Sequence, residues 1–291
     1  MNASRGIVVA GNWKMNHGPH AARSFIEELA ALGFPGAKAK QSIEAKTLRL
    51  RLFAPSLSVS ATQAAIENLG KSETSRNPWI EVGVQNAHFE RSGAFTGEIS
   101  GPLLLECGIR TVLIGHSERR QHFGETNTSA GQRMASLLDQ GFEVVFCVGE
   151  TRAEREAGKT EAVLAKQLDE AFLATQAFLK AKNRSLTPEL WNSLVIAYEP
   201  VWAIGTGLTA TPEQAQEAHA QVRHWFRSQK QKCEFPLPDA DRISLLYGGS
   251  VTPENFARLL ECPDVDGALV GGASLQATSF LKLIEIGAQA I

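Results

Sequence analysis

The sequence predicts an α/β fold in which eight strand–helix units close into a single (β/α)8 barrel. Three observations support this class. Short apolar runs rich in β-forming residues recur along the chain, each is followed by a longer helical pattern, and polar or glycine-rich residues directly follow many of the runs. The number of units allows either a barrel or an open doubly wound sheet. The barrel is favoured because barrel sites collect residues from the ends of many strands, whereas open sheets use one switch point.

The predicted strands are distributed along the whole chain. They are Ile7–Ala10, Leu48–Ala54, Ile80–Val84, Thr111–Ile114, Val144–Val148, Leu194–Tyr198, Ile243–Tyr247 and Ala268–Val270. Thr211-Pro212 predicts a helix start, because threonine suits the N-cap and proline the first helical position, and Gln214 completes a capping box. Thr252-Pro253 and Thr187-Pro188 share the first part of this pattern and predict two further helix starts.

One domain over residues 1–291 accommodates all of these units. Segments near residues 35–46, 71–78 and 180–190 are polar and lack strong apolar periodicity. We therefore expect them to be enlarged peripheral loops or helix extensions and not linkers between domains.

Composition excludes several classes of protein. The chain has 29 basic and 31 acidic residues and a net charge of −2, which argues against a general nucleic-acid binder or a basic membrane-surface protein. Its apolar runs are too short to span a bilayer, and no signal peptide is apparent. The four cysteines, Cys107, Cys147, Cys233 and Cys262, form no C-x-x-C pair. Reduced thiols and a cytoplasmic location are therefore expected.

The most informative segment follows the sixth predicted strand, which ends in Glu199. A carboxylate on a rigid strand end, beside a small-residue loop, suits a general base next to a lid. The alternative is a surface glutamate at a strand terminus. The loop also matches G-x-G-x-x-A, but Glu199 to Ala203 separates it from the strand, which argues against dinucleotide binding. The predicted lid comprises Pro200, Val201, Trp202, Ala203, Ile204, Gly205, Thr206, Gly207, Leu208, Thr209 and Ala210.

Two other strand ends carry candidate catalytic groups. His116 follows the fourth strand and could open a helix, whose N-terminus would lower the imidazole pKa and keep the ring neutral. Asn12 and Lys14 follow the first strand, where the ammonium group could neutralise a phosphate and a developing oxyanion together. A structural histidine and a solvated lysine are the alternatives. No further ligand lies at metal-binding spacing from the histidines of the chain, so no metal is expected.

Glycine pairs follow the last two strands, in Gly248-Gly249-Ser250 and in Gly271-Gly272. Paired glycines let backbone N–H groups approach an anion, and phosphate sites recur after strands seven and eight of barrels. Either pair alone could be a tight turn, but both together favour a phosphate site. The sequence has no G-x-x-x-x-G-K-[ST] loop, so hydrolysis of nucleoside triphosphates has no support.

Taken together, these motifs resemble the triosephosphate isomerase family. The resemblance rests on Asn12–Asn16, Gln85-Asn86, Gly93–Glu98, His116–Arg120, Cys147–Glu150, the Glu199–Ala210 segment and both glycine pairs, which occur in the family's order. It implies a TIM barrel that interconverts dihydroxyacetone phosphate and D-glyceraldehyde 3-phosphate through an enediolate, in glycolysis and gluconeogenesis. Neither a metal nor an organic cofactor is implied.

The resemblance also implies a role for each matching residue. Glu199 is similar to the base that moves the proton, His116 to the neutral electrophile, and Asn12 and Lys14 lie beside them. Glu118 resembles the carboxylate that positions Lys14, and Cys147 the buried cysteine that supports the base. The implied phosphate contacts are Gly205, Ser250, Gly271 and Gly272.

Thr96 belongs to the loop that, in the family, inserts into a neighbouring subunit, so a homodimer is implied. Two departures stand out. Leu208 replaces the lysine found in many members at the second hinge of the lid, which affects the expected closing kinetics and not the chemistry. The enlarged segments make the chain longer than a typical barrel of about 250 residues.

Two other classes of function remain alternatives. The first is another phosphate-binding barrel, such as an aldolase or an indole-forming lyase. A Schiff-base aldolase needs a lysine on a central strand, and apart from Lys14 no predicted strand end supplies one. The second is an inactive barrel kept as a scaffold, which would be expected to lose Glu199, His116 or Lys14, yet all three are present.

Overall fold

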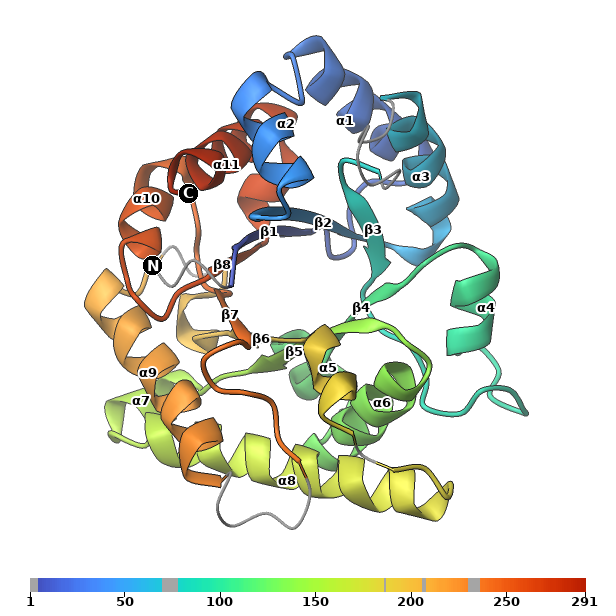
Figure 1. Cartoon of the computed structure of the whole chain (residues 1–291), viewed down its shortest axis with the longest axis vertical. Coiled ribbons are helices and arrows are strands. Elements are labelled where there is room, and N and C mark those ends of the chain that lie inside the picture. Colours follow the sequence, from blue (N-terminus) through green and yellow to red (C-terminus); the bar gives the residue numbers. More distant parts are fainter. Residues whose placement is uncertain (1–4, 70–77, 186, 206–207, 230–235) are drawn as a thin grey trace.

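The computed structural model describes residues 5–69, 78–185, 187–205, 208–229 and 236–291. Eight parallel strands close into a barrel in sequence order, which confirms the predicted fold class (Figure 1). Their bounds are β1 Ile7–Asn12, β2 Leu48–Ala54, β3 Glu81–Val84, β4 Thr111–Ile114, β5 Glu143–Val148, β6 Leu194–Tyr198, β7 Ser244–Tyr247 and β8 Gly267–Val270. All eight predicted strands are present, and β1 extends two residues beyond its predicted end to include Asn12.

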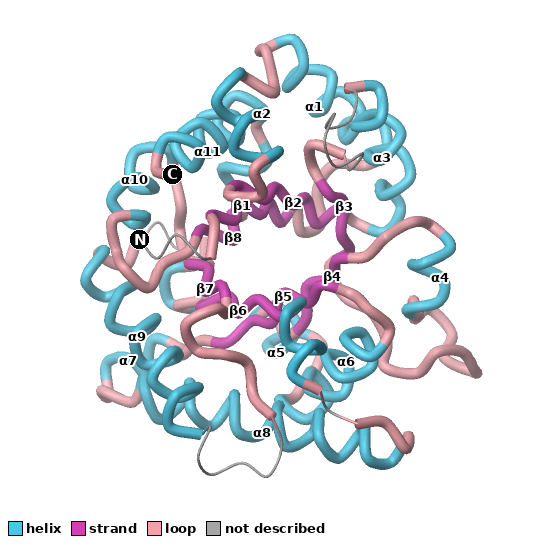
Figure 2. The backbone as a smooth tube through the Cα atoms, viewed as in Figure 1, coloured by secondary structure: helices cyan, strands magenta, loops and turns pink. Residues whose placement is uncertain are grey.

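Helices surround the ring of strands, as Figure 2 shows. The α-helices are α1 Pro19–Ala31, α2 Ala37–Glu44, α3 Val59–Asn68, α4 Gly101–Glu106, α5 Ser117–His122, α6 Asn127–Asp139, α7 Arg152–Glu156, α8 Thr160–Ala181, α9 Pro212–Gln229, α10 Pro253–Leu260 and α11 Ala277–Gln289. Short 3-10 helices are η1 Ser56–Ser58, η2 Pro188–Ser193, η3 Val201–Ala203 and η4 Gly272–Leu275. Among the helices of the described residues, none combines the length and the apolar composition that a membrane span requires.

The predicted helix starts have two outcomes. Thr211 and Gln214 exchange hydrogen bonds at the start of α9, with the Thr211 amide donating to the Gln214 side chain at 2.9 Å and the Gln214 amide to the Thr211 hydroxyl at 3.2 Å. Thr252 caps α10 in the same way, with Asn255 as its partner. Thr187 instead precedes η2, because Leu194 enters β6 only six residues after Pro188 and leaves no length for an α-helix.

Two of the three peripheral segments can be described. The segment near 35–46 contains α2, which packs beside α11 on the outside of the barrel (Figure 1). The segment near 180–190 contains the end of α8 and the start of η2, and nearly all of 71–78 lies outside the described residues.

The alternation of β2, Leu-Arg-Leu-Arg-Leu-Phe-Ala, explains how the barrel is filled. Leu48, Leu50 and Leu52 belong to the core between strands and helices, whereas Phe53 belongs to a separate apolar cluster inside the barrel. Because alternate side chains of a strand share a face, Arg49 and Arg51 also point inward, below Phe53. The inner cluster is completed by Val8, Ala10, Leu113, Val145, Cys147, Val195, Ala197, Leu246 and Leu269.

An ionic cluster fills the barrel at the N-terminal ends of the strands. The Arg51 guanidinium donates to both Glu143 oxygens, at 2.7 and 3.0 Å, and Arg49 lies 3.6 Å from the same carboxylate. Burial raises the pKa of Glu143, but the two arginines lower it by more, to about 2. Since that value is below the ordinary 4.5, the ionised pair stabilises the fold above pH 4.5.

Replacing Glu143 with glutamine is expected to lower the free energy of unfolding at pH 7 by about 3 kcal/mol. This is the free energy that corresponds to the lowering of the Glu143 pKa from 4.5 to about 2. The difference between the two proteins should shrink as the pH falls from about 4.5 towards 2, because the native carboxylate is then protonated too. Urea unfolding at fixed protein concentration and several pH values measures both effects.

Glu156→Gln is the matched control, because Glu156 forms an exposed ion pair with Arg152 on α7. This substitution should leave the unfolding midpoint unchanged. An equal effect of the two substitutions at pH 7, or a Glu143→Gln deficit that persists at pH 2, would contradict the stabilising role of the inner pair.

Candidate active site

A cavity of about 470 Å³ opens at the C-terminal ends of the strands. It brings together residues that are far apart in the sequence and that follow β1, β4, β6, β7 and β8. Every predicted catalytic and substrate-binding residue lines it, namely Asn12, Lys14, His116, Glu199, Gly205, Ser250, Gly271 and Gly272. The predicted supporting residues Glu118, Cys147 and Thr96 lie outside this lining.

The Glu199 carboxylate is held on both oxygens. Its Oε1 lies 2.9 Å from His116 Nε2, and its Oε2 accepts a hydrogen bond of 2.9 Å from the Ser117 amide. The Glu199 amide donates to the Val148 carbonyl at 2.7 Å, which continues the β5–β6 ladder past the end of β6. Because Glu199 is only 2% exposed, its position is set by these contacts and not by solvent.

Hydrogen bonding fixes the tautomer of His116. This residue is the N-cap of α5, and its Nδ1 accepts a hydrogen bond of 3.2 Å from the Glu118 amide. An N–H group can only donate, so Nδ1 is unprotonated and the ring proton is on Nε2, facing Glu199. The helix start therefore selects the tautomer whose N–H, on Nε2, is directed at Glu199.

The pKa values of the pair are shifted in opposite directions. Burial lowers the pKa of His116, but the adjacent Glu199 carboxylate raises it by more, so that it lies above its ordinary value. Burial raises the pKa of Glu199, but His116, the Ser117 amide and Lys14 lower it by more. The expected lowering of the His116 pKa is wrong for this arrangement, because that prediction considered the helix N-terminus and not a carboxylate in contact with the ring.

Lys14 has a strained backbone that several contacts hold in place. Its φ of 52° is unusual for a residue other than glycine. Its amide donates to Asn12 Oδ1 at 3.0 Å, and its carbonyl accepts from Gln85 Nε2 at 2.8 Å. Its ammonium group lies 2.6 Å from Glu118 Oε1. The side chain therefore reaches the cavity in one defined orientation.

Two residues behind Glu199 were given no role of their own from the sequence. Gly149 lies against the Glu199 backbone so closely that an added Cβ would be 1.8 Å from the Glu199 carbonyl oxygen. Gln167 of α8 braces it, because its side chain accepts from the Gly149 amide at 2.8 Å and donates to the Gly149 carbonyl at 2.9 Å. Cys147 is fully buried nearby, and burial together with the Glu199 charge raises its thiol pKa.

Both tyrosines of the chain are linked to the predicted lid segment, Tyr247 directly and Tyr198 through Glu150, and sequence reasoning missed these links. The Tyr198 hydroxyl and the Trp202 indole N–H donate to the same oxygen of buried Glu150, at 3.0 and 2.9 Å. The Tyr247 hydroxyl accepts from the Ala210 amide at 3.2 Å. The segment is therefore tied to the barrel near both of its ends.

The middle of this segment is described only in part. Gly205 has a φ of +68°, a conformation that suits glycine, and Leu208 is 47% exposed. Thr206 and Gly207 lie outside the described residues.

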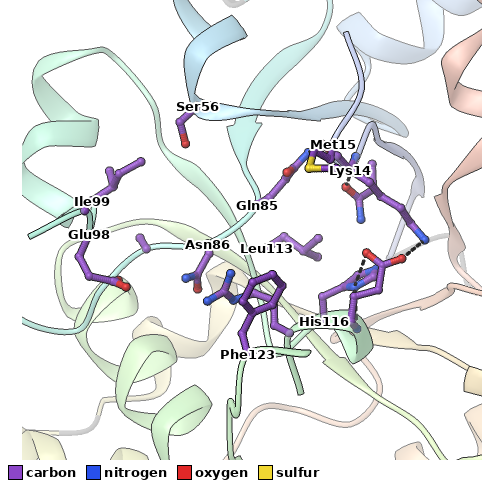
Figure 3. A pocket seen from close by; sticks show the side chains of 15 residues that line it. Lys14, Met15, Ser56, Gln85, Asn86, Glu98, Ile99, Leu113, His116 and Phe123 are labelled. Carbon is purple, nitrogen blue, oxygen red and sulfur yellow. Dashed lines mark hydrogen bonds and ion pairs between the residues drawn. The ribbon is translucent and has the colours of Figure 1, made fainter. Parts of the chain in front are cut away.

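A second cavity of about 360 Å³ adjoins the first and shares Asn12, Lys14 and His116 with it. Figure 3 shows Lys14 and His116 among the side chains that line this second cavity. Met15, at its rim, is 96% exposed. Gly97 and Glu98 also line this cavity, whereas Thr96 is exposed beside them on the same loop. Thr96 itself lines neither of these cavities in its own chain.

Comparisons with known proteins agree with the motifs. The family model described as triosephosphate isomerase matches residues 7–287. A triosephosphate isomerase from Cytophaga hutchinsonii is 41% identical over 95% of this chain and 97% of its own length. Triosephosphate isomerases from Shewanella oneidensis (38% identical, 99% and 100% covered) and Streptococcus agalactiae (39% identical, 97% and 98% covered) match as completely. The chain therefore belongs to the triosephosphate isomerase family.

Proposed function

We propose that this chain interconverts dihydroxyacetone phosphate and D-glyceraldehyde 3-phosphate, a step of glycolysis and gluconeogenesis. The observation that carries the proposal is the 2.9 Å contact between Glu199 and the Nε2–H of His116 in one cavity with Lys14. A base and two electrophilic groups around one small space are what proton transfer next to a carbonyl requires. The 38–41% identity to proteins named triosephosphate isomerase supports the same substrate pair.

Glu199 is the base of the proposed reaction. It removes a proton from C1 of the ketose, and the C–H electron pair forms the C1=C2 bond of an enediolate while charge moves to the carbonyl oxygen. A proton then moves from the hydroxyl on C1 to the oxygen on C2. The same carboxyl group returns its proton to C2 as the C1=O bond forms, so that the aldose forms without net gain or loss of atoms. Since the pKa of Glu199 lies below its ordinary value, the group is ionised and ready to accept a proton at neutral pH.

His116 and Lys14 stabilise the enediolate oxygens. In the free protein, the Nε2–H of His116 is directed at Glu199, so substrate must enter between them and accept this hydrogen bond in place of the carboxylate. Its neutral form is favoured once the carboxylate is displaced, because the amide at Nδ1 remains. Lys14 adds a positive charge, and Asn12 holds its backbone. The loss of one such donor typically costs about 3–4 kcal/mol in the transition state.

Phosphate binding is assigned to Gly205, Ser250, Gly271 and Gly272, which line the same cavity. The segment from Pro200 to Ala210 closes over the bound substrate and excludes water, which protects the enediolate from loss of phosphate. The Tyr198–Glu150–Trp202 and Tyr247–Ala210 contacts hold the two ends of this segment. Cys147 and Glu118 support the positions of Glu199 and Lys14.

The test is a coupled assay on the purified protein, with glyceraldehyde 3-phosphate as substrate and a dehydrogenase that consumes dihydroxyacetone phosphate as the readout. Turnover in the absence of added metal or organic cofactor is expected. A protein that binds the substrate without converting it would favour the scaffold alternative, and formation of a carbon–carbon bond would favour the aldolase alternative.

The proposal includes a homodimer. The loop Gly93–Glu98 is exposed in the isolated chain. The second cavity, which the exposed Met15 lines, has room for the same loop of another copy. Phe95, at 43% exposure, and Phe123, at 69%, lie on the same region and would be covered by a partner. We assign Thr96 of each chain to the second cavity of the other.

Light scattering at micromolar concentration is expected to give a mass twice the 31.5 kDa of one chain. Thr96→Arg should shift the equilibrium towards the monomer and lower activity, because it adds bulk and charge to the inserted loop. An active wild-type monomer at this concentration would contradict the dimer and the assignment of Thr96.

Two further parts of the proposal concern the whole chain. Residues 1–291 form one barrel domain, which is supported by the packing of α11, near the C-terminus, against β1. A cytoplasmic location is supported by the free thiols of Cys107, Cys147 and Cys262 in the described part of the chain.

A further inference from the structure

The loop after β1 contacts two consecutive backbone carbonyls of η4. The indole N–H of Trp13 donates to the Ser274 carbonyl at 3.0 Å, and Nε2 of His17 lies 3.1 Å from the Leu275 carbonyl. A carbonyl oxygen can only accept, so this imidazole nitrogen carries the proton. Two aromatic side chains of one loop therefore hold the same short turn, which includes Gly272 and directly follows Gly271.

His17 occupies a backbone conformation that side chains rarely adopt. Its φ is 58°, in the left-handed region that glycine enters without strain. The Ser58 hydroxyl donates to the His17 carbonyl at 2.5 Å and helps to hold this conformation. The imidazole packs against the rings of Trp13 and Phe25, with centroids 4.7 and 5.6 Å apart. A strained residue held by this many contacts indicates a requirement for its side chain.

The turn that His17 contacts is itself internally tied. The Ser274 hydroxyl and amide both donate to the Gly271 carbonyl, at 2.7 and 2.9 Å, so Gly271 and Ser274 move together. Fixing the Ser274 and Leu275 carbonyls therefore fixes Gly271 and Gly272, which line the cavity. Backbone groups that bind an anion must be held within about 0.5 Å of their working positions.

We propose that His17 is a positioning residue for the phosphate site, where its hydrogen bond to Leu275 holds the Gly271–Leu275 turn against the Lys14 loop. The inference rests on the proposed function, because it takes the substrate's phosphate as the occupant of this turn. It adds a physical link between the loop of Lys14, which stabilises the oxyanion, and the Gly271–Leu275 turn, which binds the phosphate. Binding energy of a remote phosphate contributes to catalysis only when both sites keep a fixed separation.

His17→Phe tests the link, because it keeps an aromatic ring against Trp13 and Phe25 and removes the donor to Leu275. We expect kcat/KM for glyceraldehyde 3-phosphate to fall about five- to tenfold, and the inhibition constant of inorganic phosphate to rise by a similar factor, as the loss of one hydrogen bond would give. The slow turnover of D-glyceraldehyde, followed by NMR in D2O, should change less than about twofold because this substrate has no phosphate.

His17→Gly is the second variant, since it also loses the donor but removes the backbone strain. It should weaken phosphate inhibition as His17→Phe does. His20→Phe, at an exposed position of α1, is the matched control and should leave all three constants unchanged. Thermal unfolding of each variant checks that the fold is retained.

Three outcomes would overturn the inference. They are an unchanged phosphate inhibition constant in both variants, an equal loss with the phosphorylated and unphosphorylated substrates, and a loss in His17→Phe that His17→Gly does not share. Failure of the proposed function itself is distinguishable, because the wild-type protein would then show no turnover of glyceraldehyde 3-phosphate.

Discussion

Glu199→Gln is expected to lower kcat by at least about 100-fold, because glutamine keeps the shape of the side chain but cannot accept the substrate proton. The effect should be on kcat and not on substrate binding alone, since in the proposed reaction the carboxylate acts on the reacting carbon. The coupled assay on purified protein measures it, with circular dichroism to show that the barrel is retained.

The structure supplies the control for this experiment. Glu156→Gln makes the same chemical change in an exposed ion pair on α7 and should leave kcat unchanged. If Glu199→Gln turned over substrate at the wild-type rate, Glu199 would have no part in the proton transfer, and the 2.9 Å contact with His116 would be structural only.

Lys14→Met is expected to lower kcat/KM by about 10³-fold or more, because it removes a charge that, in the proposed reaction, faces both the developing oxyanion and the phosphate. Methionine keeps most of the side-chain length, and the amide and carbonyl contacts with Asn12 and Gln85 do not depend on the side chain. The backbone should therefore remain in place, and steady-state kinetics in both directions measures the loss.

A second variant separates two causes of this effect. Removing the ammonium group leaves the Glu118 carboxylate unpaired, since the two groups are 2.6 Å apart in the native protein. In Lys14→Met/Glu118→Gln, that extra negative charge is absent. The double variant should recover less than about tenfold, because the missing positive charge dominates. Lys166→Met, on the exposed face of α8, is the control, and normal kinetics of Lys14→Met would contradict the proposed role.

The strands and the candidate site residues were predictable because they depend on local pattern. Each strand is an apolar run of the right length, and in a barrel the ends of such runs meet at one rim. Glu199, His116 and Lys14 could therefore be assigned to the same end of the molecule without any knowledge of distances. The Thr211–Gln214 capping box was equally local, since both partners lie within one helical turn.

What the sequence could not supply depends on contacts between distant residues. The raised pKa of His116 comes from a carboxylate 83 positions away, which outweighs the effect of burial. Gly149 and Gln167 act through the backbone of Glu199, and a glycine or a glutamine carries no local mark of such a role. Tyr198 and Tyr247 are the last residues of β6 and β7, and this position could have been recognised from the sequence. The partners of their hydroxyl groups lie on other elements, which the sequence does not indicate.

The interior of the barrel has a polar region at each end. Ten apolar side chains fill its middle, between the arginine–glutamate cluster at one end and the Glu199 cavity at the other. Substitutions at distant, unconnected sites change the free energy of unfolding additively. Substitutions in the arginine–glutamate cluster can therefore raise or lower thermal stability without changing the catalytic site. An engineer could exchange Arg49, Arg51 and Glu143 together for well-packed apolar residues, a change that is often neutral or favourable in other proteins, and keep the turnover number. Thermal stability and catalysis could then be changed independently within a single barrel.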